Sequence, residues 1–351
     1  MRANGRPSFS LSTKLLLAGA AAAGIAYAVR ERRRMDFQGK TVVISGGSRG
    51  LGLELARAFV REGANVVLLA RNQDQLAGAA REFERTRARV SALACDVCKE
   101  DEVRSSVASI IGEFGAIDVL INNAGMIQVG PAEHMNAEDF AAAMDVHFWG
   151  PLYLMRAVIP HMKRRGHGRI VNVASIGGKV AVPHLLPYVA SKFALVGLSE
   201  GMRTELAKDG IYVTTVCPGL MRTGSHVNAF FKGQHEKEFA LFSLIAASPL
   251  FSTDSASAAR RIVDACRYGA SEIVITPQAR LLRLVAGLFP NLVAEAMSVL
   301  GRALPGPADG AGDRLKRGWQ SYSKVAPSFL TRPADRASGR NREARQPASA
   351  P

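Results

Sequence analysis

The chain has 351 residues, which is long enough for one large α/β domain or two small ones. Its formal net charge of +15 would suit nucleic acid, but the excess is +6 in residues 1–34, +2 in 35–278 and +7 in 279–351. Because the basic excess lies at the ends and no base-reading module is recognisable, we expect no nucleic-acid partner.

The first element is an apolar run over residues 15–29, flanked by Lys14 and by the basic residues Arg30 and 32–34. A spanning helix typically needs about 20 residues, although Lys14 and Arg30 could snorkel and widen the span. We expect residues 1–35 to form an uncleaved membrane anchor, with the domain on the cytoplasmic side because the stronger basic cluster follows the run. The alternative is a signal peptide cleaved after residues 26–28, which would place the mature protein outside the cytosol.

Strand-like segments alternate with helical patterns through residues 36–278. The strand-like runs are apolar without polar alternation, which is typical of a parallel sheet covered on both faces. The pattern predicts a single α/β domain with a doubly wound parallel sheet. The expected strands are residues 41–45, 65–70, 89–94, 119–122, 169–174, 212–217 and 272–275.

A glycine-rich turn follows the first expected strand. Gly46, Gly50 and Gly52 have the spacing Gly-x-x-x-Gly-x-Gly, and a helical pattern begins at Leu51. Glycine lets the backbone approach a pyrophosphate closely, and the N–H groups of a first helical turn favour its negative charge. The turn therefore indicates dinucleotide binding, although as a lone motif it is weak.

The end of the second expected strand bears on the choice of cofactor. NAD-binding folds commonly place an acidic residue here for the ribose hydroxyls, whereas this chain reads Leu69-Ala70-Arg71. Two guanidiniums, those of Arg49 and Arg71, would suit a 2′-phosphate, so we expect NADP(H) to be preferred over NAD(H). The alternative is that both are ordinary surface arginines.

The four cysteines do not make a convincing disulfide framework. Cys95 and Cys98 have a spacing that suits a metal or a redox pair, but zinc would need a second ligand pair and none is evident. We therefore expect reduced thiols and no metal site.

Tyr188 and Lys192 are four residues apart and would share one face of a helix. An ammonium close to a phenol favours the phenolate, so Tyr188 could exchange a proton near neutral pH. Ser175, upstream at the end of a strand-like run, could hydrogen-bond the same substrate oxygen. A Tyr and a Lys at this spacing, taken alone, are more often a solvated helix face.

The glycine turn, residues 122–125 (Asn-Asn-Ala-Gly), Ser175, Tyr188 with Lys192, and Pro218-Gly219 occur together in the order of one family. In this combination, residues 38–278 resemble the short-chain dehydrogenase/reductase family. The resemblance implies a Rossmann-type domain in which Ser175, Tyr188 and Lys192 are catalytic. The cofactor contacts that we expect are Gly46, Ser48, Arg49, Gly50, Leu51, Gly52, Arg71, Asp96, Val97, Asn123, Ala124, Gly125, Tyr188, Lys192, Pro218, Gly219 and Thr223.

The resemblance also implies a reaction. NADPH would give a hydride to a carbonyl carbon while Tyr188 gives a proton to the oxygen that Ser175 orients, and the same groups would oxidise an alcohol in reverse. Lys192 would favour the phenolate and hold the nicotinamide ribose. One departure is His147, because many relatives have an asparagine there that supports a water-linked proton path. His147 could retain the backbone role of that asparagine, or it could impair the relay. The alternative function is therefore a membrane-associated nucleotide-binding scaffold with little or no turnover.

Residues 224–251 usually cover the substrate in this family, and here they are rich in Phe and Leu. Either an apolar pocket for a lipophilic ketone or aldehyde, or ordinary core packing, would explain this composition. The apolar residues in question are Phe230, Phe231, Phe239, Leu241, Phe242, Leu244, Ile245 and Phe251, with Val180, Val182, Leu185 and Leu186 before the tyrosine.

The remaining chain is an expected helical extension and a tail. Residues 279–304 predict an amphipathic hairpin that binds a membrane surface or, alternatively, packs on the domain or on a dimer partner. Family members often form dimers or tetramers, so a homo-oligomer is possible. Residues 305–351 are rich in Gly, Pro, Ser, Ala and Arg, which predicts a largely disordered basic tail.

Overall fold

The computed structural model describes residues 11–310, 312–323, 325–328 and 330–343. Its centre is a seven-stranded parallel sheet with the order β11-β7-β6-β4-β1-β2-β3. The predicted α/β class with a doubly wound parallel sheet is therefore confirmed, and each expected strand lies within one residue of its observed bounds. The strands are β1 (Thr41–Ser45), β2 (Asn65–Ala70), β3 (Val90–Ala94), β4 (Val119–Asn122), β6 (Gly168–Val173), β7 (Ile211–Cys217) and β11 (Glu272–Val274).

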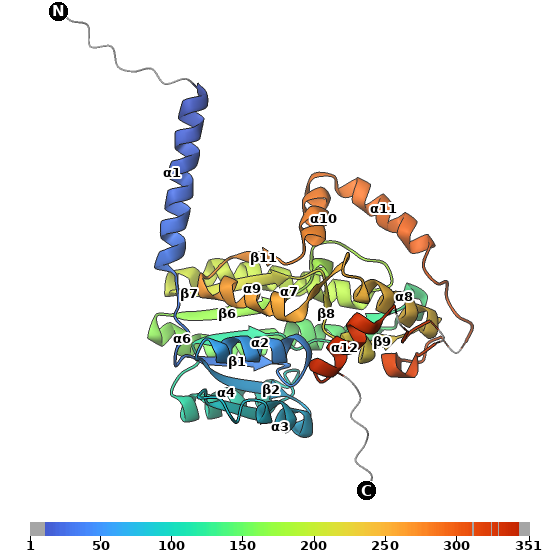
Figure 1. Ribbon diagram of the computed structural model, residues 1–351, viewed down its shortest axis with the longest axis horizontal. Helices are drawn as coiled ribbons and strands as arrows, with labels where there is room; N and C mark the ends of the chain where they lie inside the picture. Colours follow the sequence, from blue (N-terminus) through green and yellow to red (C-terminus); the bar gives the residue numbers. More distant parts are fainter. Residues whose placement is uncertain (1–10, 311, 324, 329, 344–351) are drawn as a thin grey trace, which may run out of the picture.

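Helices cover both faces of this sheet (Figure 1). Along β1, Val42 and Ile44 belong to the core beneath α2, α3 and α9, whereas Val43 belongs to the core beneath α4 and α6. Since side chains alternate across a strand, an apolar run buries both faces. The helices are α2 (Gly50–Arg61), α3 (Gln73–Arg81), α4 (Glu100–Phe114), α5 (Ala137–Met144), α6 (Gly150–Arg165), α7 (Leu186–Leu206), α8 (His235–Ala247) and α9 (Ser255–Arg267).

Shorter elements connect these strands and helices. A π-helix, η2 (Asp145–Trp149), joins α5 to α6. The turns η1 (Ala132–His134), η3 (Ile176–Gly178), η4 (Ala207–Asp209) and η5 (Ser225–Val227) are 3₁₀-helices, and the short strands are β5 (Gln128–Val129), β8 (Leu220–Arg222), β9 (Phe230–Phe231) and β10 (Ser252–Asp254).

The N-terminal apolar run lies in α1 (Leu11–Arg32), which projects away from the domain (Figure 1). Among the described residues, no helix combines the length and the apolar character that crossing a membrane requires. The predicted anchor, and with it the membrane location with a cytoplasm-facing domain, is therefore wrong. The physical reason is that the apolar run ends after residue 29 and consists largely of Ala and Gly, which bury little apolar surface.

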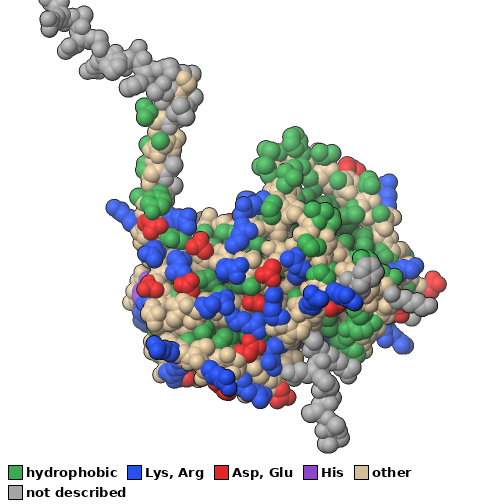
Figure 2. All heavy atoms as spheres, viewed as in Figure 1, with side chains coloured by type: hydrophobic (Ala, Val, Ile, Leu, Met, Phe, Trp, Pro, Cys, Tyr) green, Lys and Arg blue, Asp and Glu red, His purple; other side chains and the backbone are tan. Residues whose placement is uncertain are grey.

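The C-terminal extension forms two helices, α10 (Pro277–Leu288) and α11 (Pro290–Arg302). The predicted helical extension is thus present, and Figure 2 shows apolar side chains gathered over it. Beyond it, the described residues form β12 (Lys316–Arg317), η6 (Gly318–Gln320) and α12 (Arg332–Arg340). This differs from the disordered tail that the composition suggests, because specific polar contacts bind the segment to the domain. Residues 344–351 lie outside the described part.

Candidate active site

A cavity of about 720 Å³ extends from the glycine turn to the C-terminal hairpin. This volume lies in the range of small-molecule and cofactor sites. Most residues predicted for the site line it together. They are Gly46, Arg49, Gly50, Leu51, Asn123, Ala124, Gly125, Ser175, Tyr188, Lys192, Pro218, Gly219 and Thr223.

The glycine turn is shaped by close backbone contacts. Gly46 has a φ of 65°, and a Cβ there would lie 2.9 Å from the Cα of Ala124. A Cβ on Gly52 would lie 2.1 Å from the carbonyl oxygen of Gly46. Side chains at these positions would open the turn, so glycine is required for its path. The Asn123 side chain fastens the turn by donating to the carbonyl of Ser45 at 3.1 Å.

Five predicted cofactor residues do not line the cavity. Ser48 and Val97 are buried in the domain, and Gly52 lies inside α2. Arg71, after the end of β2, is exposed, and Asp96 lies in the loop between β3 and α4. Of the predicted loops, the glycine turn therefore lines the cavity, whereas the loops after β2 and β3 contribute no lining residue.

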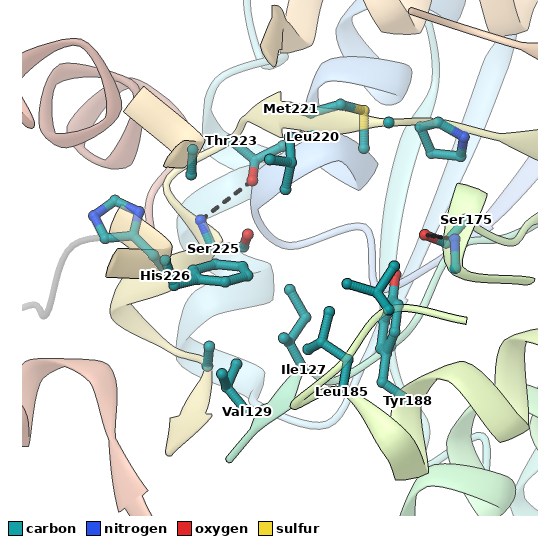
Figure 3. A pocket seen from close by; sticks show the side chains of 18 of the residues that line it. Ile127, Val129, Ser175, Leu185, Tyr188, Leu220, Met221, Thr223, Ser225 and His226 are labelled. Carbon is teal, nitrogen blue, oxygen red and sulfur yellow. Dashed lines mark hydrogen bonds between the residues drawn. The ribbon is translucent and has the colours of Figure 1, made fainter. Parts of the chain in front are cut away.

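Ser175, Tyr188 and Lys192 lie close together in the cavity wall. Ser175 lies two residues after the end of β6. Its Oγ accepts a hydrogen bond from the N–H of Gly177 at 3.0 Å. The Lys192 Nζ donates to the carbonyl of Val173 at 2.9 Å. It also lies 5.6 Å from the centre of the Tyr188 ring, one helical turn away on α7. Figure 3 shows the Ser175 and Tyr188 side chains close together on one side of the pocket.

Burial controls the charges of this group. Burial raises the pKa of Tyr188 above its usual value of 10, and the hydrogen bond with Ser175 lowers it by less. Burial lowers the pKa of Lys192 to about 7. Desolvation disfavours the charged form of each group, which opposes the phenolate-favouring effect that the Tyr–Lys spacing suggests. In this structure, the group whose pKa lies near neutrality is the lysine.

His147 is fully enclosed beside this group, in the π-helix. Its Nε2 accepts from the N–H of Met126 at 3.1 Å, and its Nδ1 lies 2.8 Å from Ser191 Oγ. Ser191 Oγ donates to the carbonyl of Tyr188, so Nδ1 carries the imidazole proton and donates to Ser191. Burial, followed by the charge of Lys192, holds the pKa of His147 well below 6.5. The ring is therefore neutral and both of its nitrogens are engaged.

The far end of the cavity is apolar. Among the residues expected from segment 224–251, the lining includes Leu241, Phe242, Ile245 and Phe251. Phe231 and Phe239 instead form a buried pair in the core, with ring centres 5.5 Å apart. The sequence left open whether the apolar residues of segment 224–251 line a pocket or pack in the core. Some of them line the cavity and others pack in the core.

The sequence did not identify several other lining residues. The C-terminal helices and the turn after them add Leu282, Met297, Leu300 and Leu304 to the apolar wall. The one-sided apolar pattern of residues 279–304 was the available signal, but it does not specify which surface the helices cover. A polar pair, His184 Nδ1 and Glu238 Oε1 at 2.7 Å, also lies in this wall.

Comparison with known proteins agrees with this geometry. The profile described as short chain dehydrogenase matches residues 40–232. Gluconate 5-dehydrogenase of Gluconobacter oxydans is 37% identical over 188 residues, which cover 54% of this chain and 73% of the relative.

Two solved structures have a similar fold. A short-chain dehydrogenase from Streptomyces avermitilis is 28% identical with a TM-score of 0.65, covering 77% of this chain and 99% of that one. L-Sorbose reductase from Gluconobacter frateurii, complexed with NADPH and L-sorbose, is 30% identical with a TM-score of 0.62, covering 69% and 97%. The chain therefore belongs to the short-chain dehydrogenase family, whose members are oxidoreductases that act on alcohol and carbonyl groups.

Proposed function

We propose that this protein is an NADPH-dependent oxidoreductase that interconverts a carbonyl and an alcohol on an apolar substrate. The observation that carries the proposal is the meeting of Ser175, Tyr188 and Lys192 between the glycine turn and an apolar wall. One end of the cavity suits a dinucleotide, the other suits a lipophilic group, and the hydroxyl pair lies between them.

The residues present fit a nicotinamide cofactor. The close contacts at Gly46 and Gly52 leave a side-chain-free turn beside the start of α2, where N–H groups favour a phosphate. Arg49 lines the same part of the cavity and Arg71 follows β2, where an acidic residue is absent. The NADPH in the similar L-sorbose reductase structure supports the same preference. When bound, the cofactor supplies or accepts a hydride.

Three side chains of the protein would supply the proton that the substrate oxygen receives. Tyr188, with its pKa raised by burial, is protonated at neutral pH and is suited to donate to a substrate oxygen. Ser175 Oγ accepts from Gly177, which leaves its own proton available for the same oxygen. Lys192, held near its midpoint at neutral pH, would restore the proton of Tyr188 after transfer. We assign general acid/base chemistry to Tyr188, orientation to Ser175 and proton supply to Lys192.

His147 is unlike the asparagine that it replaces in this arrangement. With both ring nitrogens engaged and the ring neutral, it connects Met126 to the catalytic helix through Ser191. We assign it a positioning role, because its ring packs edge-on against Tyr188 at 5.4 Å between centres. A neutral ring with no free nitrogen is a poor member of a proton relay.

The proposed apolar substrate is inferred from the residues that line the cavity. Val182 and Leu185 precede Tyr188, and α8 and the C-terminal helices contribute further apolar lining residues. Figure 3 shows Ile127 and Leu185 beside Tyr188 at the pocket. A long aliphatic or polycyclic ketone or aldehyde would bury apolar surface there at about 25 cal/mol per Å². Sugar substrates, such as those in the names of the similar proteins, would leave their hydroxyls facing this apolar wall.

The test is turnover by the purified full-length chain against ketones and aldehydes graded by apolar size, with NADPH and NADH compared. We expect NADPH-dependent reduction that becomes more efficient with apolar size. Tyr188→Phe is expected to lower kcat by roughly 10²- to 10⁴-fold, because it removes the proton donor. Tyr268→Phe, which lies outside the cavity, is the matched control. Cofactor binding without any turnover would instead favour a nucleotide-binding scaffold, and full activity of Tyr188→Phe would refute the assigned chemistry.

A further inference from the structure

The end of the described chain crosses the cofactor side of the cavity. Helix α12 packs on α8 and β8, and its position beside them can be followed in Figure 1. Just after this helix, the carbonyl of Asn341 accepts from the N–H of Gly50 in the glycine turn at 2.9 Å. The side chain of the same residue donates to the carbonyl of Thr223 on the opposite lip at 3.0 Å. Asn341 therefore connects the two sides between which a dinucleotide would lie.

Two residues further on, the Glu343 carboxylate enters the cavity. Its side chain is only 7% exposed, and its Oε2 lies 2.9 Å from Arg49 Nη1. The same oxygen accepts from Asn228 Nδ2 at 2.6 Å. A Cβ on Gly50 would lie 2.6 Å from Glu343 Oε1, so the carboxylate stands directly over the glycine turn. An anion that contacts a glycine turn and a guanidinium has the partners that suit a phosphate.

The positive charges near the Glu343 carboxylate outnumber its single negative charge. Arg317, on β12, stacks over the ring of Phe230 at 4.7 Å. Burial, followed by the charges of Arg49 and Arg71, lowers the pKa of Arg317, so Arg317 lies within the electrostatic reach of both other guanidiniums. Among the ion pairs of the described residues, Arg49 has Glu343, while Arg71 and Arg317 have none. The cluster therefore favours a more highly charged anion than a single carboxylate.

We propose, on the basis of the NADPH-binding function above, that the C-terminal segment 331–343 is an internal competitor of the cofactor. Glu343 occupies the phosphate position at Arg49 and Gly50, and it leaves when a phosphate-bearing dinucleotide binds. In the closed state, the segment is held by Arg340, which pairs with Asp254 at 2.9 Å, and by Asn341. Cofactor binding therefore displaces the segment and opens the adjoining lip.

Cofactor affinity tests this competition in the full-length chain. NADPH, NADH and adenosine 2′,5′-bisphosphate are titrated into the wild type and into Glu343→Gln, with binding followed by calorimetry. If the closed state is populated about 90% of the time, its loss tightens apparent binding about tenfold. We expect this gain for NADPH, for NADH and for the bisphosphate, because each carries a phosphate that needs the position of Glu343. The control is Glu113→Gln, which removes an exposed carboxylate paired with Arg89 far from the cavity.

A second variant separates displacement from a simple change of charge. Arg340→Gln loosens the segment and leaves Glu343 and Arg49 intact, so it is also expected to tighten NADPH binding. Hydrogen exchange of the wild type gives an independent readout: residues 331–343 should exchange faster with saturating NADPH, while residues 46–52 become protected. Unchanged or slower exchange of 331–343, or an affinity gain in Glu343→Gln but none in Arg340→Gln, would overturn the competition and leave the proposed function standing. Failure of every variant to bind either cofactor would refute the proposed function as well.

Discussion

Lys192 offers a test that separates the chemistry of the site from the stability of the fold. The residue is almost fully enclosed, at 5% exposure, and burial lowers the pKa of its ammonium from 10.5 to about 7. The enclosed ammonium destabilises the folded state because it loses its hydration. Lys192→Met keeps most of the side-chain volume and removes the charge, while it also leaves the carbonyl of Val173 without its donor.

The sign of the pH dependence follows from the direction of the pKa shift. Below pH 7, the folded and unfolded chains both carry a charged Lys192, and the wild type bears the whole destabilisation. Above pH 7, the folded protein releases this proton, while the unfolded chain keeps it until about pH 10. The wild type therefore becomes more stable relative to the variant as the pH rises through this window. The slope is at most about 1.4 kcal/mol for each pH unit.

The measurement is urea unfolding of both proteins at about pH 6, 7, 8 and 9, followed by circular dichroism. The variant's advantage in unfolding free energy should fall by roughly 2–3 kcal/mol from about pH 7 to 9 and be nearly constant below pH 7. Lys208→Met removes an exposed lysine and should change stability little at any of these values. A difference between Lys192→Met and wild type that does not change with pH would refute the desolvation argument.

Two further predictions concern the parts of the cavity wall. His147→Phe should lower the free energy of unfolding by about 1–3 kcal/mol, because the N–H of Met126 loses its buried acceptor. It should also lower kcat without changing the shape of the rate profile between about pH 6 and 8, since the ring is already neutral. Thermal unfolding measures the loss of stability, and pH–rate profiles of the two proteins measure the effect on kcat. An inflection near neutral pH that is present in the wild type and absent from His147→Phe would contradict the reasoning. Phe231→Ala should destabilise the fold by about 3–5 kcal/mol, whereas Phe242→Ala, on the cavity wall, should cost less and mainly raise KM for apolar carbonyls. A larger loss of stability in Phe242→Ala than in Phe231→Ala would contradict the placement of Phe231 in the core and Phe242 on the cavity wall.

The sheet and its order of chemical motifs were predictable because they depend on local patterns. Buried parallel strands need continuous apolar runs, and such runs at 41–45 and 65–70 coincide with β1 and β2. The glycine turn and the Tyr188–Lys192 spacing are equally local, so their positions at the ends of strands and on one helix face followed from the sequence alone.

The contacts between distant segments were not predictable in the same way. Glu343 and Arg49 are almost 300 residues apart, and nothing in the composition of the tail distinguishes this glutamate from a solvated one. Phe231 and Phe242 belong to one aromatic-rich segment, yet one is enclosed in the core and the other lines the cavity. The N-terminal run differs from the prediction because its Ala and Gly residues are apolar but bury little surface.

The boundary of the family match divides the site into two parts. The match ends at residue 232, which includes the glycine turn, Ser175, Tyr188 and Lys192. Leu241, Phe242, Leu282, Met297 and Leu300, which form much of the apolar wall, and Glu343 over the glycine turn all lie beyond it. The matched part therefore contains the residues to which we assign the chemistry, whereas much of the apolar wall and Glu343 lie in the C-terminal third. Under the proposed function, the wall residues that would contact the substrate lie largely outside this match, so the names of the similar proteins do not identify the substrate of this one.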